Sequence, residues 1–118
     1  MLGFTLRGYT HSMDTIDSIL ASRQSARASK AVGDLALLNA HQRVAARLTI
    51  PGEYAPLCQR ALAQVSLWER NGLCHSRYIL AWRSLLSQPV GALNATMLRD
   101  DPEGVALRQN TPFGFALG

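Results

Sequence analysis

The chain has 118 residues, of which 47% are hydrophobic and 17% charged, and its formal net charge is +4. This is the size and composition of one globular domain that can bury a core of its own. No apolar run approaches the roughly 18–20 uncharged residues that span a bilayer, and residues 1–12 lack the apolar core and cleavage site of a signal peptide. We therefore expect a cytoplasmic protein with no membrane segment.

The spacing of apolar residues and of helix-terminating residues predicts helices almost throughout. Residues 1–12 are expected to form a flexible leader, because the first strongly helical stretch opens at Met13. The expected helices then cover residues 13–29, 34–48, 56–70, 77–87, 90–99 and 102–110, separated by glycines, prolines and polar turn residues. Gly33 marks a break in this pattern, although one helix that continues through it is also compatible with the sequence.

The sequence predicts an all-α fold: a single compact bundle of five to six short helices that occupies residues 13–110. Residues 111–118 alternate apolar and small side chains, which is typical of an extended segment. We expect an extended C-terminal tail there. Its apolar side chains, Phe113, Phe115 and Leu117, either bind a partner protein or dock on the domain's own core.

Two tryptophans lie on the apolar faces of consecutive predicted helices. Trp68 shares its helix with Val65, and Trp82 shares the next helix with Ile79 and Leu85. A short turn forces these helices together, so we expect both indoles to be buried in a common core. His41 falls on an apolar helix face as well, where a hydrogen-bonded core histidine is far more common than a catalytic base.

Basic side chains recur at helical spacing in the N-terminal half. Arg23, Arg27 and Lys30 follow an i, i+4, i+7 pattern, which places them on one face of a helix. Such a stripe can follow a phosphate backbone, and its simplest alternative is a solvated helix face.

Residues 64–87 resemble the helix-turn-helix unit of DNA-binding proteins. Apolar residues and a turn glycine fall at the expected places, namely Leu67, Gly72, Leu73, Tyr78 and Ala81. With Ser76 as the expected cap of the second helix, the resemblance implies that Arg77, Arg83 and Ser84 face outward and contact DNA at a steeply crossed corner. Trp68, Asn71 and Leu80 depart from the pattern, and a plain helical corner used for packing is the alternative.

Catalytic and metal-binding patterns are sparse. Cys58 and Cys74 have no C-x-x-C partner, so we expect both thiols to be reduced and no metal to be bound. The adjacent Cys74 and His75 are badly placed for a nucleophile–base pair, since neighbours in a turn usually point apart. The chain contains no phosphate-binding loop, dinucleotide fingerprint or zinc-protease motif. We expect no catalytic residue and no cofactor.

Two hypotheses follow from these patterns. The first is a small non-enzymatic regulatory protein, transcriptional or antitoxin-like, that binds double-stranded DNA through residues 64–87 and the basic stripe. The second is an adaptor or neutralising partner that binds a protein and makes no nucleic-acid contact. A homodimer is expected in either case, because the apolar residues are many for short helices and two tryptophans are available to anchor an interface.

Overall fold

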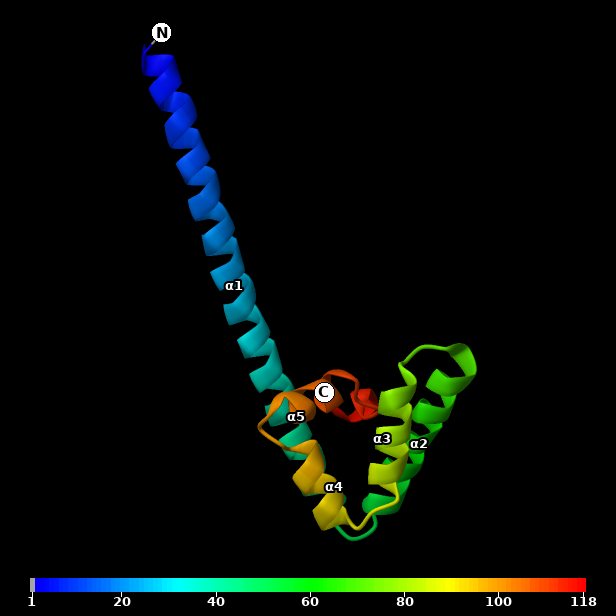
Figure 1. The fold of residues 1–118 in the computed structure, drawn as a ribbon. Coiled ribbons are helices and arrows are strands. Elements are labelled where there is room, and N and C mark those ends of the chain that lie inside the picture. Colours follow the sequence, from blue (N-terminus) through cyan, green and yellow to red (C-terminus); the bar gives the residue numbers. More distant parts are fainter. Residues whose placement is uncertain (1) are drawn as a thin grey trace. The chain divides into compact units, whose positions relative to one another are not determined.

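The computed structural model describes residues 2–118, with their side chains from Thr15 onward. Every regular element in this part of the chain is a helix, which confirms the all-α fold (Figure 1). In chain order they are α1 (Leu2–Leu48), α2 (Tyr54–Asn71), α3 (Ser76–Leu86), α4 (Val90–Met97), α5 (Pro102–Gln109) and a short 3-10 helix, η1 (Gly114–Ala116). None of the described helices combines the length and apolarity needed to cross a bilayer.

Helix α1 differs most from the sequence-based expectation. It has 47 residues and begins at Leu2, so it covers most of the segment expected to be a leader, and it continues through Gly33. A single glycine costs a helix only about 1 kcal/mol relative to alanine, and the neighbouring residues are largely good helix formers. Gly33 therefore does not end the helix.

The chain divides into two compact units, one ending at Gly33 and the other spanning residues 34–118. A single compact bundle of short helices is thus not confirmed. The first unit is helical, and each side chain described in it, from Thr15 to Val32, is exposed. An isolated helix gains no tertiary packing, which is the main source of helix stability in proteins.

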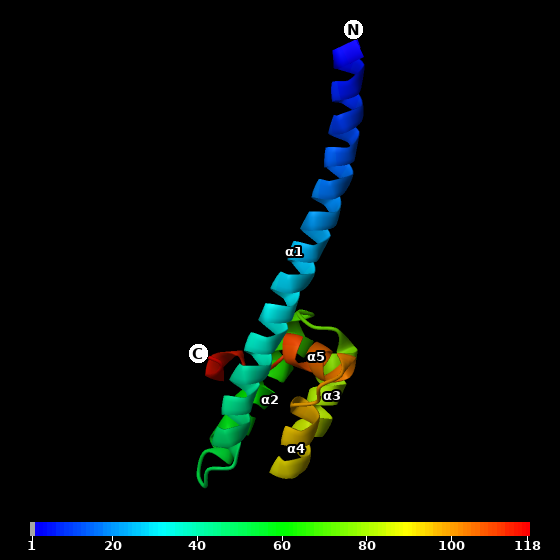
Figure 2. The ribbon, with the colours of Figure 1, turned by 90° about the vertical axis from the view of Figure 1, so that its left-hand side faces the viewer.

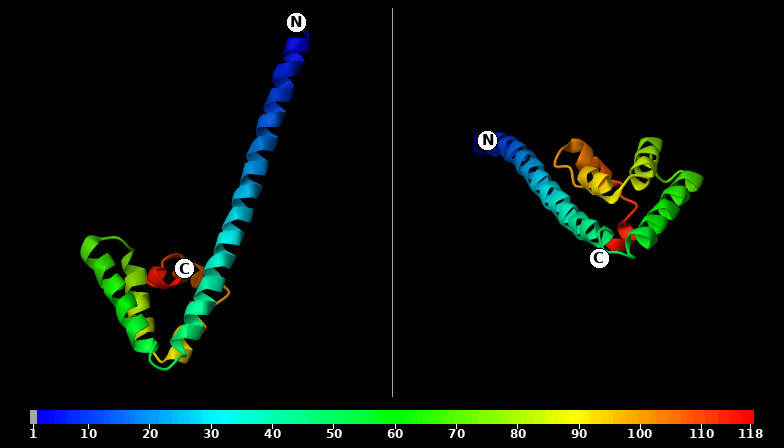
Figure 3. Two further views of the ribbon diagram at one scale, coloured as in Figure 1. Left: turned by 180° about the vertical axis from the view of Figure 1, so that it is seen from behind. Right: turned by 90° about the horizontal axis from the view of Figure 1, so that it is seen from below.

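The second unit contains the core. Helices α2 and α3 run side by side in opposite directions, and α4 lies between α3 and the last part of α1 (Figures 1 and 3). Turning the molecule, as in Figure 2, keeps α2 and α3 adjacent. The buried apolar side chains come from all five α-helices and the C-terminal segment: Val44, Ala45, Leu48, Leu57, Cys58, Ala61, Val65, Ile79, Trp82, Leu85, Leu86, Leu93, Met97, Leu107 and Phe113.

Trp82 is fully buried in this core, as the sequence predicts, whereas Trp68, for which the sequence also predicts burial, is only partly buried against it. The Trp82 indole N–H donates a hydrogen bond to the carbonyl oxygen of Asn110 at 2.8 Å. Its ring packs edge-on against Phe113, with ring centroids 5.9 Å apart. Such an edge-to-face pair stabilises the fold beyond simple area burial.

The C-terminal residues do not form the extended tail that the alternating pattern predicts. They turn into η1, and Phe113 is completely buried under Trp82. The Thr111 hydroxyl oxygen lies 2.8 Å from Nε2 of His41 and accepts the backbone N–H of Phe113. Burying a phenylalanine outweighs the local preference for extended backbone, because full burial of such a side chain contributes about 1.5–3 kcal/mol.

Local capping sets several helix ends. Gly72 adopts the left-handed conformation, with φ 61°, and its N–H donates to the Trp68 carbonyl, which ends α2 as the sequence predicts. Asp101 caps α5 with its carboxylate on the Gly104 N–H, followed by Pro102 in the first turn. The cap of α3 is His75 instead of Ser76, since its Nδ1 accepts the N–H of Arg77 at 3.1 Å.

Candidate nucleic-acid interface

The basic side chains differ in how far the protein itself neutralises them. Three form ion pairs with acidic side chains, namely Arg47 with Glu53, Arg83 with Glu69, and Arg99 with Asp101 and Glu103. A fourth, Arg108, is buried. A cation already paired with a carboxylate has less to gain from a phosphate, so the unpaired cations are the better candidates for an anion-binding surface.

Arg83 is held by a bidentate ion pair between α3 and α2. Its Nη1 lies 2.6 Å from Glu69 Oε2, and its Nη2 lies 3.0 Å from Oε1. The hydrogen bonds from Arg83 lower the pKa of the Glu69 carboxyl, and those to Glu69 raise the pKa of the guanidinium. Arg83, which the sequence assigns to DNA contact, therefore ties the two helices of the corner together.

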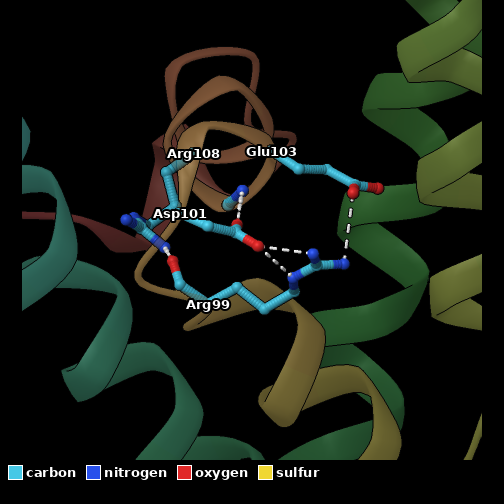
Figure 4. Close-up of polar contacts among 5 residues, drawn as sticks. Arg99, Asp101, Glu103 and Arg108 are labelled. Atoms are coloured by element: carbon cyan, nitrogen blue, oxygen red, sulfur yellow. Dashed lines mark hydrogen bonds and ion pairs between the residues drawn. The ribbon is translucent and has the colours of Figure 1, made fainter.

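A second polar cluster joins α4 to α5 (Figure 4). The Asp101 carboxylate accepts hydrogen bonds from the Gly104 N–H and from Arg99, and these two hydrogen bonds, the first more than the second, lower its pKa. Arg108 donates from Nη1 to the carbonyl oxygens of Met97 and Arg99, at 2.9 and 2.8 Å. The Met97 carbonyl belongs to the last turn of α4, where the helix dipole favours a cation, and the Arg99 carbonyl follows two residues later, so Arg108 has a structural task.

The outer face of α3 is poor in free charge. Arg77, Leu80 and Ser84 are exposed at i, i+3, i+7 spacing, and Leu80 is 66% exposed. Of these three side chains, only Arg77 carries a charge. The steep crossing implied by the helix-turn-helix resemblance is not observed, because α2 and α3 lie side by side (Figures 1 and 3). The corner thus resembles a packed helical hairpin more than a protruding recognition helix.

The stripe in the first unit is different. Arg23, Arg27 and Lys30 lie on one face of α1, and all three are exposed. Within the described residues none of them forms an ion pair. Asp17 is the one acidic residue between Thr15 and Gly33. Because each residue of an α-helix turns the side-chain direction by about 100°, Asp17 points about 110° away from the mean direction of the three basic side chains. No acidic side chain described from Thr15 onward compensates these three charges.

Exposed apolar side chains precede the basic stripe on the same helix face. Ile16, Ile19 and Leu20 are 58, 46 and 51% exposed. A cluster at i, i+3, i+4 spacing is the pattern by which a helix normally packs against another element. The sequence shows these residues as part of an expected core helix, yet no described side chain buries them.

The apolar C-terminal residues proposed for partner binding belong to the second unit and pack in or against its core. Phe113 is fully buried, while Phe115 and Leu117 are half-buried and packed on the core. The Arg60 guanidinium lies 4.1 Å from the centroid of the Phe115 ring. Of the two roles that the sequence allows for these side chains, docking on the domain itself is the one observed for Phe113.

The side chains that could serve in catalysis, His41 and the two cysteines, lie in surroundings typical of residues that only support the fold. His41 is fully buried, with Nδ1 2.7 Å from the Leu37 carbonyl oxygen, and burial lowers its pKa. Cys58 is buried and its thiol pKa is raised for the same reason, while Cys74 is half-buried; neither is in a disulfide. The described residues contain no cluster of three or more His, Cys, Asp or Glu side chains suited to a metal ion.

Sequence reasoning missed the acidic partners of the arginines. Glu69 and Arg83 are fourteen residues apart on different helices, so no helical spacing links them. The spacing of Arg99 and Glu103, which is i, i+4, was a usable signal of an ion pair. Of the residues predicted to contact DNA, Arg23, Arg27 and Lys30 belong to the first unit, and Arg77, Arg83 and Ser84 belong to the second.

Comparison with known proteins gives no match: no family model, no curated protein and no solved structure is similar to this chain.

Proposed function

We propose that this chain is a non-enzymatic regulatory protein that binds the phosphate backbone of double-stranded DNA through the basic face of α1. This basic face consists of Arg23, Arg27 and Lys30. The observation that carries the proposal is the contrast among the cations. These three are exposed, aligned and, among the side chains described from Thr15 onward, unpaired, whereas Arg83 on the suspected recognition helix is paired with Glu69.

The dimensions of the basic face suit a duplex. From Arg23 to Lys30 the helix rises about 10 Å, at 1.5 Å per residue. An α-helix fits into the major groove, and arginine donates bidentate hydrogen bonds to phosphate oxygens. The basic face offers few polar groups suited to reading bases. It is therefore better suited to contacts with the DNA phosphate backbone, which position a protein on the duplex, than to base contacts, which specify a sequence.

Exposed isoleucines support a second candidate function, a protein-interaction adaptor. Ile16, Ile19 and Leu20 offer an apolar helix face that another protein's helix can cover. In that case the basic face pairs with acidic side chains of the partner. A homodimer through the basic face itself would place like charges opposite each other, which opposes self-association there.

A salt titration of duplex binding tests the first function. The test variant carries Arg23→Gln, Arg27→Gln and Lys30→Gln, which keeps good helix formers in α1. Fluorescence anisotropy with a labelled 24-base-pair duplex, repeated between 50 and 300 mM salt, gives the slope of log K against log salt. Each lost phosphate contact should reduce that slope by about 0.9, so the triple variant should lose about 2.7.

A matched control variant distinguishes the effect of losing the basic face from the effect of lowering the net charge of the protein. The variant Arg47→Gln, Arg83→Gln and Arg99→Gln removes the same charge from cations that acids already neutralise, and its slope should change much less. Equal losses in both variants would assign binding to overall charge. If the unchanged protein shows no salt-dependent duplex binding, the DNA function is wrong and the adaptor function takes its place.

A further inference from the structure

A groove of about 450 Å³ lies between α3 and α5. This volume is within the range of small-molecule sites, about 300–1,000 Å³. Its lining comes from two helices that are separate in the sequence, and it includes Arg77, Tyr78, Ala81, Glu103, Ala106 and Leu107. The lining combines apolar side chains with the charged Arg77 and Glu103, and a few polar groups placed among apolar walls are what orient a ligand in such a site.

Arg77 supplies the unpaired charge of this groove. No described acidic side chain forms an ion pair with it, in contrast to Arg83 and Arg99. Its guanidinium lies 5.3 Å from the centroid of the Tyr78 ring, a cation–π contact that restrains the side chain while its N–H groups stay available. A guanidinium held in this way is suited to a carboxylate, which it can bind through two parallel hydrogen bonds.

Glu103 lies on the opposite wall, and its solvent-exposed ion pair with Arg99 compensates its negative charge only in part. Its Oε2 is 3.2 Å from Nη1 of Arg99, and Figure 4 shows the two side chains reaching toward each other. A carboxylate on this wall repels a second negative charge on a ligand. The groove therefore disfavours dianions and the closely spaced phosphates of nucleic acid, and it favours a single negative charge.

The rest of the lining sets the shape of the ligand. Ala81, Ala106 and Leu107 are apolar, and the two alanines leave room between the helices. A ligand with a hydrocarbon body would remove this surface from water, which contributes about 25 cal/mol per Å² of apolar area buried. The apolar surface thus adds to the anchoring by Arg77.

We propose that the α3–α5 groove binds a small organic monocarboxylate with an apolar body, whose carboxylate is held by Arg77. The binding links α3 to α5, so the ligand acts as an effector or cargo of the protein. This site is independent of DNA binding by α1. It also gives Arg77 a different role from the nucleic-acid contact that the sequence predicts.

Phenylacetate is the probe for this site, with isothermal titration calorimetry of the full chain as the measurement. We expect saturable binding of one phenylacetate per chain. The neutral analogue 2-phenylethanol should bind at least tenfold more weakly, because it lacks the charge-assisted pair with Arg77. The dianion phenyl phosphate should also bind more weakly than phenylacetate.

Three variants assign the binding to the groove. Arg77→Gln should weaken phenylacetate binding about tenfold or more, whereas Arg70→Gln, with the same charge change outside the groove, should leave it unchanged. Glu103→Gln should improve the binding of phenyl phosphate relative to phenylacetate. Circular dichroism of each variant confirms that the helices remain folded.

Several outcomes would overturn the proposal. They are no saturable phenylacetate binding by the unchanged protein at millimolar concentration, equal affinity for 2-phenylethanol, or equal losses in Arg77→Gln and Arg70→Gln. The duplex titration distinguishes this failure from failure of the proposed function, since Arg77→Gln should leave the slope contributed by the basic face of α1 unchanged.

Discussion

The imidazole of His41 and the hydroxyl of Thr111 meet at 2.8 Å although seventy residues separate them in the sequence. Nδ1 of the ring faces the Leu37 carbonyl oxygen, which can only accept, so Nδ1 carries the proton and Nε2 accepts from the hydroxyl. The hydroxyl oxygen in turn accepts the N–H of Phe113. This chain of hydrogen bonds joins α1 to the C-terminal segment, and burial favours the neutral ring by lowering the pKa of His41.

We predict that stability depends on pH through His41. Burial, with a smaller contribution from the Arg108 charge, lowers the pKa of the ring below its ordinary value of 6.5, although the hydrogen bond to Leu37 acts in the opposite direction. In the unfolded chain the ring is protonated as pH falls through about 6.5, while the folded chain resists protonation until lower pH. The stabilisation is therefore complete above pH 6.5 and is lost progressively below it.

Urea unfolding at several pH values between 5 and 8 measures this effect. The free energy of unfolding should fall more steeply toward pH 5 in the unchanged protein than in His41→Gln. Identical pH dependence in the two proteins would show that His41 does not contribute. The C2 proton shift of the His41 ring, followed by NMR, gives its folded-state pKa directly.

We predict that Trp82 contributes much more to stability than Trp68. Trp82→Ala should reduce the free energy of unfolding by about 3–5 kcal/mol, since the indole is fully buried and its loss leaves a cavity beside Phe113. Trp68→Ala should cost clearly less, because that side chain is only partly buried. Chemical denaturation followed by circular dichroism measures both, and equal losses would contradict the difference in burial.

We predict opposite effects for alanine at two helical glycines. A Cβ on Gly104 would press against the Arg99 carbonyl, lying 2.8 Å from its carbon atom, so the α4–α5 junction must shift. Gly104→Ala should cost about 1–3 kcal/mol of unfolding free energy, as for overpacked sites. Gly91→Ala is the control, because nothing lies within 4 Å of the added atom. It should be neutral or stabilise by up to about 1 kcal/mol.

We predict that Glu69→Gln has little effect on duplex binding. This change frees Arg83 from its ion pair, so it would strengthen binding and steepen the salt slope if the outer face of α3 contacted DNA, as the helix-turn-helix resemblance implies. If α1 makes the contacts, the slope should stay nearly constant. Anisotropy titrations at several salt concentrations decide between the two helices. Glu53→Gln, which frees Arg47 from its ion pair in the same way, is the comparison variant.

The sequence alone determined the helical class and several helix ends. Gly72 ends α2 in the left-handed conformation, and Asp101 with Pro102 starts α5, as their residue types indicate. These features depend on interactions within three or four residues, so they can be predicted from the local sequence. The buried faces of α2 and α3, including Val65 and Trp82, follow from helical spacing in the same way.

Only the tertiary structure decided which charged and apolar side chains remain available. Arg83 is paired with Glu69, fourteen residues away on α2, and Phe113 of the C-terminal segment is buried against Trp82 of α3. Neither contact has a local signature, because each depends on how helices and the C-terminal segment pack. The same packing brings Arg77 and Glu103 to one groove. Helix α1 continues through Gly33, and its basic face, Arg23, Arg27 and Lys30, is exposed. Local preferences of about 1 kcal/mol set helix ends, whereas burial of large side chains and pairing of charges between helices decide which side chains remain exposed and unpaired in the described part of the chain.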